Sequence, residues 1–415
     1  MKLSMPTRRE IVYQASKGYD KLSKKKKTER LNNLITITGY NRDYASRLLS
    51  QSGRCVYVKD ISGRSYRLIG DVRKKKERSR KRKYDTEVFK VLKQIWAIMD
   101  YPCGKRLAPG MSWLVPKLEA FGEITIGQEE VREKLLTISA SSIDRLLQGE
   151  KKKMALKSRK ITKPGTLLKN QIEVRTFADW NKAKVGFMEM DLVSHEGGNP
   201  RGDFAFSLTL TDVCSGWTEN RAVKNRAQKW TSEALDIIRD RLPFPIKGLD
   251  SDNDSTFINY HMLCYCEKNH ITFTRSRAGN KNDGCYVEQK NWSIVRRTVG
   301  YARYDTEEEV DILNQIYDVL RLYVNMFQPV AKLISKERQG AKVRKIYDTP
   351  KTPGQRLLES PDISEEVKAQ LQKTFDELNP AALKREIDRL LRKLTKAYLK
   401  KKEEVEQIDR ELIFT

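Results

Sequence analysis

Three acidic residues stand at positions where they could form one metal-binding site. Asp191 lies in an alternating apolar stretch, residues 185–194, that predicts a strand. Asp252 follows a second short apolar stretch, and 35 residues separate it from Glu288, which begins an amphipathic helix. Carboxylates from two strands and a helix can converge, and hard divalent cations prefer oxygen ligands. A pair of such ions can drive an in-line displacement at phosphorus, so no side-chain nucleophile is required.

The three acids and their neighbours resemble the D, D-35-E triad of retroviral integrases and insertion-sequence DDE transposases. Two stretches of the sequence also resemble local motifs of that family, S-D-N-G-x-x-F and N-x-x-x-E-x-x-N, in the right order. Ser251-Asp252-Asn253 with Phe257 resembles the first motif, and Asn282, Val287-Glu288-Gln289 and Asn291 resemble the second. Asp254 stands where the family usually has glycine, and an aspartate also tolerates left-handed turn geometry. The resemblance covers about residues 180–330.

The resemblance implies an RNase H-like core that holds two Mg²⁺ ions per site, with Mn²⁺ as a substitute. In that arrangement Asp191 would bridge both ions, Asp252 would complete one ion's site and Glu288 the other's. The implied activity is DNA cleavage and strand transfer at the ends of a mobile element. The implied partners are double-stranded DNA, both as element ends and as target, and further copies of the chain that form a homo-oligomer on this DNA. No small-molecule substrate is expected.

Other residues compete with these three. Asp250 lies on the same strand face as Asp252, although the Ser-Asp-Asn motif favours Asp252. Glu189 is either a supporting carboxylate or an ordinary strand residue, and Asp212 is expected to cap a turn. Trp292 is expected to pack in the core, with stacking on a base as the alternative.

The elements that must position these residues follow an α/β order. Alternating and apolar stretches predict three strands, then helices alternating with two further strands. The predicted strands are 185–194, 204–210, 218–223, a short strand before Asp252, and 271–274, and the predicted helices are 227–241, 257–267, 286–299 and 305–325. This order is typical of layered α/β domains, and it is the order of the RNase H-like core.

Positive charge is concentrated ahead of this core. The chain has 415 residues and a formal net charge of +26, and nearly all of the excess lies before residue 181. Residues 6–50 predict three helices, with a cap at Asn41 and a glycine-containing turn before a short basic helix, which is typical of a helix-turn-helix. Residues 131–147 predict a second helix-turn-helix. Basic helical modules beside a nearly neutral core favour a DNA-binding function over an ordinary three-helix bundle.

We therefore expect a multidomain protein with N-terminal all-α helix-turn-helix modules, a central α/β RNase H-like catalytic core and a mostly helical C-terminal region. The predicted divisions are a first DNA-binding domain at 1–72, a basic linker at 73–83, a second helical DNA-binding domain at 84–149, a basic linker at 150–179, the catalytic core at 180–328 and the C-terminal region at 329–415. Within the last, residues 332–346 predict a hairpin or basic arm. The apolar stripe of a helix at 381–409 could pack within the chain or against a partner helix.

The basic residues expected to contact DNA come from the two helical modules, the first linker, the glycine-rich loop before Glu288 and the helix that carries it. They are Arg42, Arg47, Lys74, Lys75, Lys76, Arg80, Lys81, Arg82, Arg145, Arg275, Arg277, Lys281, Lys290 and Arg296. Lysine and arginine in such segments can pair with phosphates. A solvated charged face is the alternative for Lys290 and Arg296.

Cysteine spacing and hydropathy limit other functions. The six cysteines include no C-x-x-C pair and the three histidines are scattered, so no zinc site of the kind found in retroviral integrases is expected. No apolar stretch reaches the roughly 20 residues of a membrane span, and no secretory signal is expected. We expect a cytoplasmic, nucleoid-associated protein bound to DNA, with no membrane partner.

Three functions remain open at this point. A DDE transposase is favoured. A DNA-binding regulator with an inactive integrase-like domain is disfavoured because all three acids are present. An RNase H-type nuclease is disfavoured because two basic helical modules suit the recognition of duplex DNA.

Overall fold

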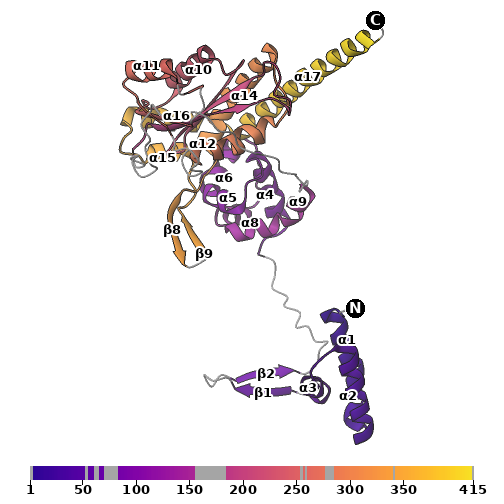
Figure 1. Cartoon of the computed structure of the whole chain (residues 1–415). Coiled ribbons are helices and arrows are strands. Elements are labelled where there is room, and N and C mark those ends of the chain that lie inside the picture. The colour runs from indigo at the N-terminus through magenta and orange to yellow at the C-terminus, as the bar shows by residue number, and fades with distance from the viewer. Residues whose placement is uncertain are drawn as a thin grey trace. The chain divides into compact units, whose positions relative to one another are not determined.

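The computed structural model describes residues 3–51, 55–59, 65–69, 83–154, 184–252, 256–257, 259–275, 285–339 and 342–413. The chain divides into two compact units, Met1–Lys83 and Tyr84–Thr415. Figure 1 draws the first in indigo and purple and the second from purple to yellow.

The N-terminal unit is a small helical domain followed by a hairpin. Its elements are α1 (Met5–Ser16), α2 (Lys24–Thr38), α3 (Arg42–Gln51), β1 (Cys55–Lys59) and β2 (Ser65–Ile69), and the two strands are antiparallel. Gly39 ends α2 with a φ of 68°, which glycine adopts at little cost. Oδ1 of Asn41 accepts a hydrogen bond from the amide of Asp43 (2.9 Å) at the start of α3. The three helices and the cap at Asn41 are confirmed, whereas the hairpin was not predicted.

A bundle of helices opens the second unit. It consists of α4 (Thr86–Ile98), α5 (Gly104–Leu107), α6 (Met111–Ala120), α7 (Glu129–Leu136), α8 (Ala140–Leu146) and α9 (Gln148–Met154). The apolar stripe of α4 is buried, as its spacing predicts. Ser139 caps α8 by accepting a hydrogen bond from the amide of Ser142 (3.2 Å), so the predicted helix, turn and helix are present.

A five-stranded mixed sheet follows the bundle. Its strands are β3 (Phe187–Ser194), β4 (Phe206–Asp212), β5 (Thr218–Val223), β6 (Gly248–Ser251) and β7 (Thr272–Arg275), in the spatial order β5-β4-β3-β6-β7. The pairs β3–β4 and β4–β5 are antiparallel, whereas β3–β6 and β6–β7 are parallel. The five strands lie where the sequence places them, in the predicted order.

Helices cover both faces of this sheet. They are α10 (Gln228–Arg241), α11 (Tyr260–Lys268), α12 (Cys285–Lys290), a π-helical continuation (Asn291–Arg296), α13 (Arg297–Val299) and α14 (Glu307–Phe327). Met188 and Met190 of β3 belong to the apolar cluster that contains α10 and α11, whereas Val193 belongs to the cluster around α14. Since side chains alternate along a strand, Glu189 and Asp191 share the face of Val193, on which α12 lies.

The bundle and the sheet region form one body. They share one apolar cluster, and polar contacts join the bundle to the end of α14. Tyr323 donates its hydroxyl to the carbonyl of Ile98 (2.6 Å), and Nε2 of Gln328 donates to the carbonyl of Met99 (2.9 Å). Residues 84–154 therefore hold a fixed position beside the sheet.

The C-terminal region packs back on the same unit. It contains the antiparallel hairpin β8 (Leu333–Gln339) and β9 (Lys342–Tyr347), then α15 (Pro353–Leu358), α16 (Glu365–Glu377) and α17 (Pro380–Ile413). The predicted hairpin is confirmed. Ile387, Leu390 and Leu394 of α17 are buried in the cluster around α14, so this stripe packs within the chain.

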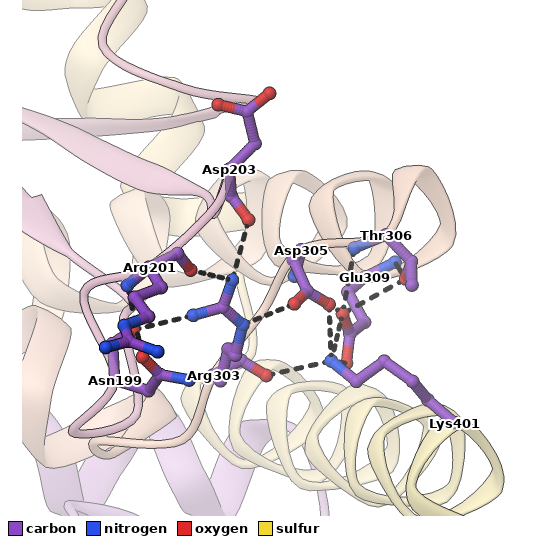
Figure 2. Close-up of polar contacts among 8 residues, drawn as sticks. All are labelled: Asn199, Arg201, Asp203, Arg303, Asp305, Thr306, Glu309 and Lys401. Carbon is purple, nitrogen blue, oxygen red and sulfur yellow. Dashed lines mark hydrogen bonds and ion pairs between the residues drawn. The ribbon is translucent and has the colours of Figure 1, made fainter. Parts of the chain in front are cut away.

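A polar network fastens α17 to the start of α14 (Figure 2). Nζ of Lys401 contacts Oδ1 of Asp305 (2.9 Å) and both carboxylate oxygens of Glu309 (2.8 Å each). Glu309 is fully buried and also completes a capping box with Thr306. The guanidinium of Arg303 joins this network to the loop between β3 and β4 by donating to the carbonyls of Asn199 (2.7 Å), Arg201 (2.9 Å) and Asp203 (2.9 Å).

The predicted fold class is confirmed: a helical N-terminal region, a central mixed sheet with helices, and a helical C-terminal region. Within the described part of the chain, no helix is both long enough and apolar enough to cross a membrane.

Candidate active site

Asp191 lies on β3, and two donors hold its carboxylate. Oδ1 accepts a hydrogen bond from the amide of Leu192 (2.8 Å), and Oδ2 accepts one from Nδ2 of Asn291 (2.6 Å). Burial, together with the negative charges of Asp252 and Glu288, raises the pKa of Asp191 to about 7. The three acids singled out in the sequence therefore lie within electrostatic reach of one another.

Asp252 and Glu288 complete this group. Asp252 is exposed directly after β6, which runs parallel to β3 with Ser251 beside Met190. Glu288 is in the first turn of α12, and partial burial and the charge of Asp252 raise its pKa. The sheet and α12 thus bring all three carboxylates to one face.

The donor set suits Mg²⁺ chemically, although the side chains are not gathered around one point. Among the residues that the structure describes, no three His, Cys, Asp or Glu side chains are close enough to hold a metal ion. The charges of Asp252 and Glu288 nevertheless raise the pKa of Asp191, and the charge of Asp252 raises that of Glu288. A divalent cation between these carboxylates would remove the repulsion. Oδ1 of Asn291, beside Asp191, is buried without a hydrogen-bond partner among the described residues, so a further oxygen is available there.

Glu189 caps the helix that carries Glu288. Its side chain is buried, and Oε2 accepts hydrogen bonds from the amides of Tyr286 (2.8 Å) and Val287 (2.9 Å). Amides in the first turn of a helix have no partner within the helix, so this carboxylate satisfies two of them. Burial is the main reason that the pKa of Glu189 rises to about 8. The geometry therefore favours a carboxylate that supports the site over an ordinary strand residue.

Asp250 makes a hydrogen bond to the neighbouring strand β7. Oδ1 of Asp250 accepts a hydrogen bond from Oγ1 of Thr274 on β7 (2.6 Å). Asp252 is instead the charged neighbour that raises the pKa values of Asp191 and Glu288. The arrangement favours Asp252 as the member of the site.

Asp212 is a turn cap, as predicted. Its Oδ2 accepts hydrogen bonds from the amide and the hydroxyl of Ser215 (2.6 Å each), and its Oδ1 accepts one from the amide of Gly186 (2.9 Å). These contacts shape the turn between β4 and β5.

The helix that carries Glu288 changes geometry soon after it. α12 continues into π-helical turns at Asn291–Arg296, and such turns are frequent at functional sites. Trp292 lies in this segment and is 64% exposed, so the expectation that it packs in the core is wrong. Its indole is free for the alternative, stacking on a base.

The predicted DNA contacts fall into three groups. Arg42, Arg47 and Arg145 are exposed, on α3 and α8. Arg275 and Lys290 are buried, which excludes a solvated face for Lys290. Arg296 is described but has a different environment. The remaining predicted contacts lie outside the described residues: Lys74, Lys75, Lys76, Arg80, Lys81, Arg82, Arg277 and Lys281.

Arg296 is half-buried and has a structural role. Its Nη2 donates to the carbonyl of Ser194 at the end of β3 (2.6 Å), and its guanidinium lies 4.7 Å from the centre of the Tyr301 ring. The residue ties the π-helical segment to the sheet.

The fold and the carboxylates define a class: a multidomain α/β protein with a helical N-terminal unit and a cluster of acidic residues on one face of a mixed sheet. No family model matches the chain. The chain belongs to the family of the uncharacterized protein y4rM of Sinorhizobium fredii (strain NBRC 101917 / NGR234). The two are 38% identical over 352 residues, which are 85% of this chain and 95% of that protein. The catalytic core domain of BIV integrase is a similar solved structure, with 16% identity over 42% of this chain and 95% of that chain and a TM-score of 0.27.

Proposed function

We propose that the protein is a DDE transposase that binds the ends of a mobile element and catalyses metal-dependent DNA cleavage and strand transfer. The observation that carries the proposal is the electrostatic coupling of Asp191, Asp252 and Glu288 on one face of the sheet. The D, D-35-E spacing and its two motifs support the class of reaction.

The chain's own residues orient the acids. Asn291 and the amide of Leu192 hold the Asp191 carboxylate, and Glu189 fixes the first turn of the helix that carries Glu288. Mg²⁺ ions held by the three carboxylates would activate a water or a DNA 3′-hydroxyl and stabilise the leaving oxygen.

The N-terminal unit is proposed to bind the element ends. Its α2 and α3, joined at Gly39, have the order of a helix-turn-helix, in which the second helix enters the major groove. Arg42, Tyr44 and Arg47 are exposed on α3, where basic and aromatic side chains suit contact with DNA.

The test is a strand-transfer assay with Mg²⁺, a plasmid target and duplexes copied from the DNA that flanks the reading frame. Asp191→Asn, Asp252→Asn and Glu288→Gln should each lower joining more than about 100-fold, as expected for loss of a group that stabilises the transition state. Binding of the duplex should persist, because these substitutions leave the N-terminal unit unchanged.

Asp250→Asn is the matched control, since it removes a neighbouring charge on the same strand. It should retain substantial activity. Complete loss of joining in this variant would reverse the choice between Asp250 and Asp252, and near-normal joining by any of the other three variants would refute that residue's role.

A further inference from the structure

A cavity of about 270 Å³ lies where the helical bundle, the helix that carries Glu288 and the end of α14 meet. Three cationic side chains line it: Arg106 from α5, Lys290 from α12 and Arg297 from α13. The hydroxyl-bearing residues Ser293 and Thr298 line it as well. The wall of this cavity is therefore rich in hydrogen-bond donors.

Lys290 has no acidic partner in this cavity. Its side chain is 5% exposed, and it makes no hydrogen bond or ion pair with any residue that the structure describes. The charged groups that act on it are Arg106, Lys332 and Arg356, all of them positive. An isolated buried cation is costly unless it is paired.

Arg106 adds a second positive charge, which forms no ion pair with the residues that the structure describes. Its Nε donates to the carbonyl of Pro329 (2.6 Å) and its Nη2 lies 3.5 Å from Oε1 of Gln328, and both acceptors are neutral. The acid on the cavity wall, Asp100, is already paired with Arg297 (2.9 Å) and faces Lys384 (3.4 Å).

The other two cations around Lys290 have acidic neighbours. Arg356 pairs with Asp348 (2.7 Å), and the charges of Asp212 and Asp348 act on Lys332. The unbalanced charge in this region is therefore that of Lys290 and Arg106, and an anion is the group that would compensate it.

We propose that this cavity binds a phosphate group, with Lys290 and Arg106 as its cationic partners. An arginine fork, a lysine point charge and hydroxyl donors together suit a tetrahedral oxyanion. The source of the phosphate rests on the proposed function: in a DNA-processing protein it is a phosphate of the DNA backbone. Since Lys290 and Glu288 lie on one short helix, a phosphate held here fixes a DNA strand relative to the acidic residues.

The first test measures thermal unfolding of the full chain with and without inorganic phosphate, at equal ionic strength set with chloride. Phosphate should raise the Tm of the wild-type protein and have little effect on Lys290→Met or Lys290→Gln. Without phosphate, both variants should unfold about 2–4 °C above the wild-type protein, because an unpaired buried charge has been removed. If Lys290 had a merely structural role, its substitution would lower the Tm instead.

The second test identifies the source of the phosphate by binding to a labelled 30-base-pair duplex at several salt concentrations. Lys290→Met should weaken binding about 10-fold and lower the slope of log affinity against log salt by about 1, as for the loss of one phosphate contact. Unchanged DNA binding together with a lost phosphate response would assign the site to a free phosphate anion.

Lys268→Met is the matched control. Lys268 is exposed at the end of α11, before β7 begins, whereas Asp252 follows the other end of the parallel strand β6. It should behave as the wild-type protein in both tests. An equal phosphate response in Lys290→Met and the wild-type protein would overturn the proposal. Absence of strand joining would count against the proposed function alone, since the phosphate test does not depend on it.

Discussion

At the scale of single residues, Glu189 stands apart because its partners are backbone amides. It accepts hydrogen bonds from Tyr286 and Val287, so it acts on Glu288 through the helix rather than by direct contact with a substrate. Glu189→Ala should lower the rate of strand joining about 10- to 100-fold, the usual effect of losing a group that orients a ligand. The affinity of the Glu189→Ala protein for duplex DNA should be unchanged, which a binding titration checks.

Glu189→Gln tests whether the hydrogen bonds matter more than the charge. The amide oxygen of glutamine can accept from the same two donors, so this variant should be faster than Glu189→Ala. If the two variants joined strands at equal rates, or if Glu189→Ala kept the wild-type rate, Glu189 would not be a positioning residue.

His195 gives the molecule a pH dependence of stability. It is fully buried after β3, with Nε2 2.8 Å from Oγ of Ser207. Burial and the charge of Arg296 lower its pKa to about 3, whereas an unfolded histidine titrates near about 6.5. The unfolded chain therefore binds a proton that the folded chain excludes. This contribution to stability is complete above about pH 6.5 and is lost as the pH falls toward 3, at up to about 1.4 kcal/mol per pH unit.

Thermal unfolding at pH 7.5, 6 and 5 checks this dependence. The fall in Tm on acidification should be smaller in His195→Gln than in the wild-type protein. His261→Gln, which changes an exposed histidine, should follow the wild-type curve. Parallel curves for all three proteins would show that His195 is not the titrating group.

At the scale of elements, the network in Figure 2 fixes α17 to α14. Lys401→Met would leave Glu309 fully buried without its counter-charge, and loss of one partner of a buried ion pair costs about 3–5 kcal/mol. Lys400→Met changes the neighbouring, exposed lysine and should alter stability by less than about 0.5 kcal/mol. Denaturant unfolding of the three proteins measures both values, and similar midpoints for Lys400→Met and Lys401→Met would contradict the assignment.

Local periodicity predicted most elements because each strand or helix carries its own pattern. The third strand, 218–223, has the predicted bounds, and the stripe of α4 is buried as expected. The expectation for Trp292 failed because it placed the ring in the core. Trp292 stands four residues after Glu288, so it lies on the same side of the helix as that acid, and its indole is exposed.

Long-range partners account for what the sequence left open at the site. Glu189 accepts a hydrogen bond from Tyr286, 97 residues later in the chain, and no local motif records that pairing. Lys290 stands between polar residues, which favours a solvated position. Its burial depends on the docking of the helical bundle beside α14, where Tyr323 meets Ile98 across 225 residues. The three acids could be proposed from the sequence because their motifs are local.

At the scale of the whole molecule, the division at Lys83 separates the proposed DNA-binding unit from the unit that carries the acids. The segment that leads up to this division, residues 73–83, is strongly basic in sequence. A transposition event must process two DNA ends, whereas each chain offers one set of three acids. We therefore expect chains to assemble on DNA, with the N-terminal unit of one chain holding an end that another chain cuts.

Complementation tests this assembly. Full-length Glu288→Gln keeps the N-terminal unit but lacks one acid, and a fragment of residues 84–415 keeps the acids but lacks that unit. Each should be inactive alone, because one cannot catalyse and the other cannot hold an element end. A mixture of the two should recover strand joining if cutting occurs in trans. The control mixture pairs the same fragment with a Glu288→Gln protein that also carries Arg42→Ala and Arg47→Ala, and it should stay inactive because end binding is lost.

Strand joining by a wild-type complex that light scattering shows to contain a single chain would defeat the assembly model.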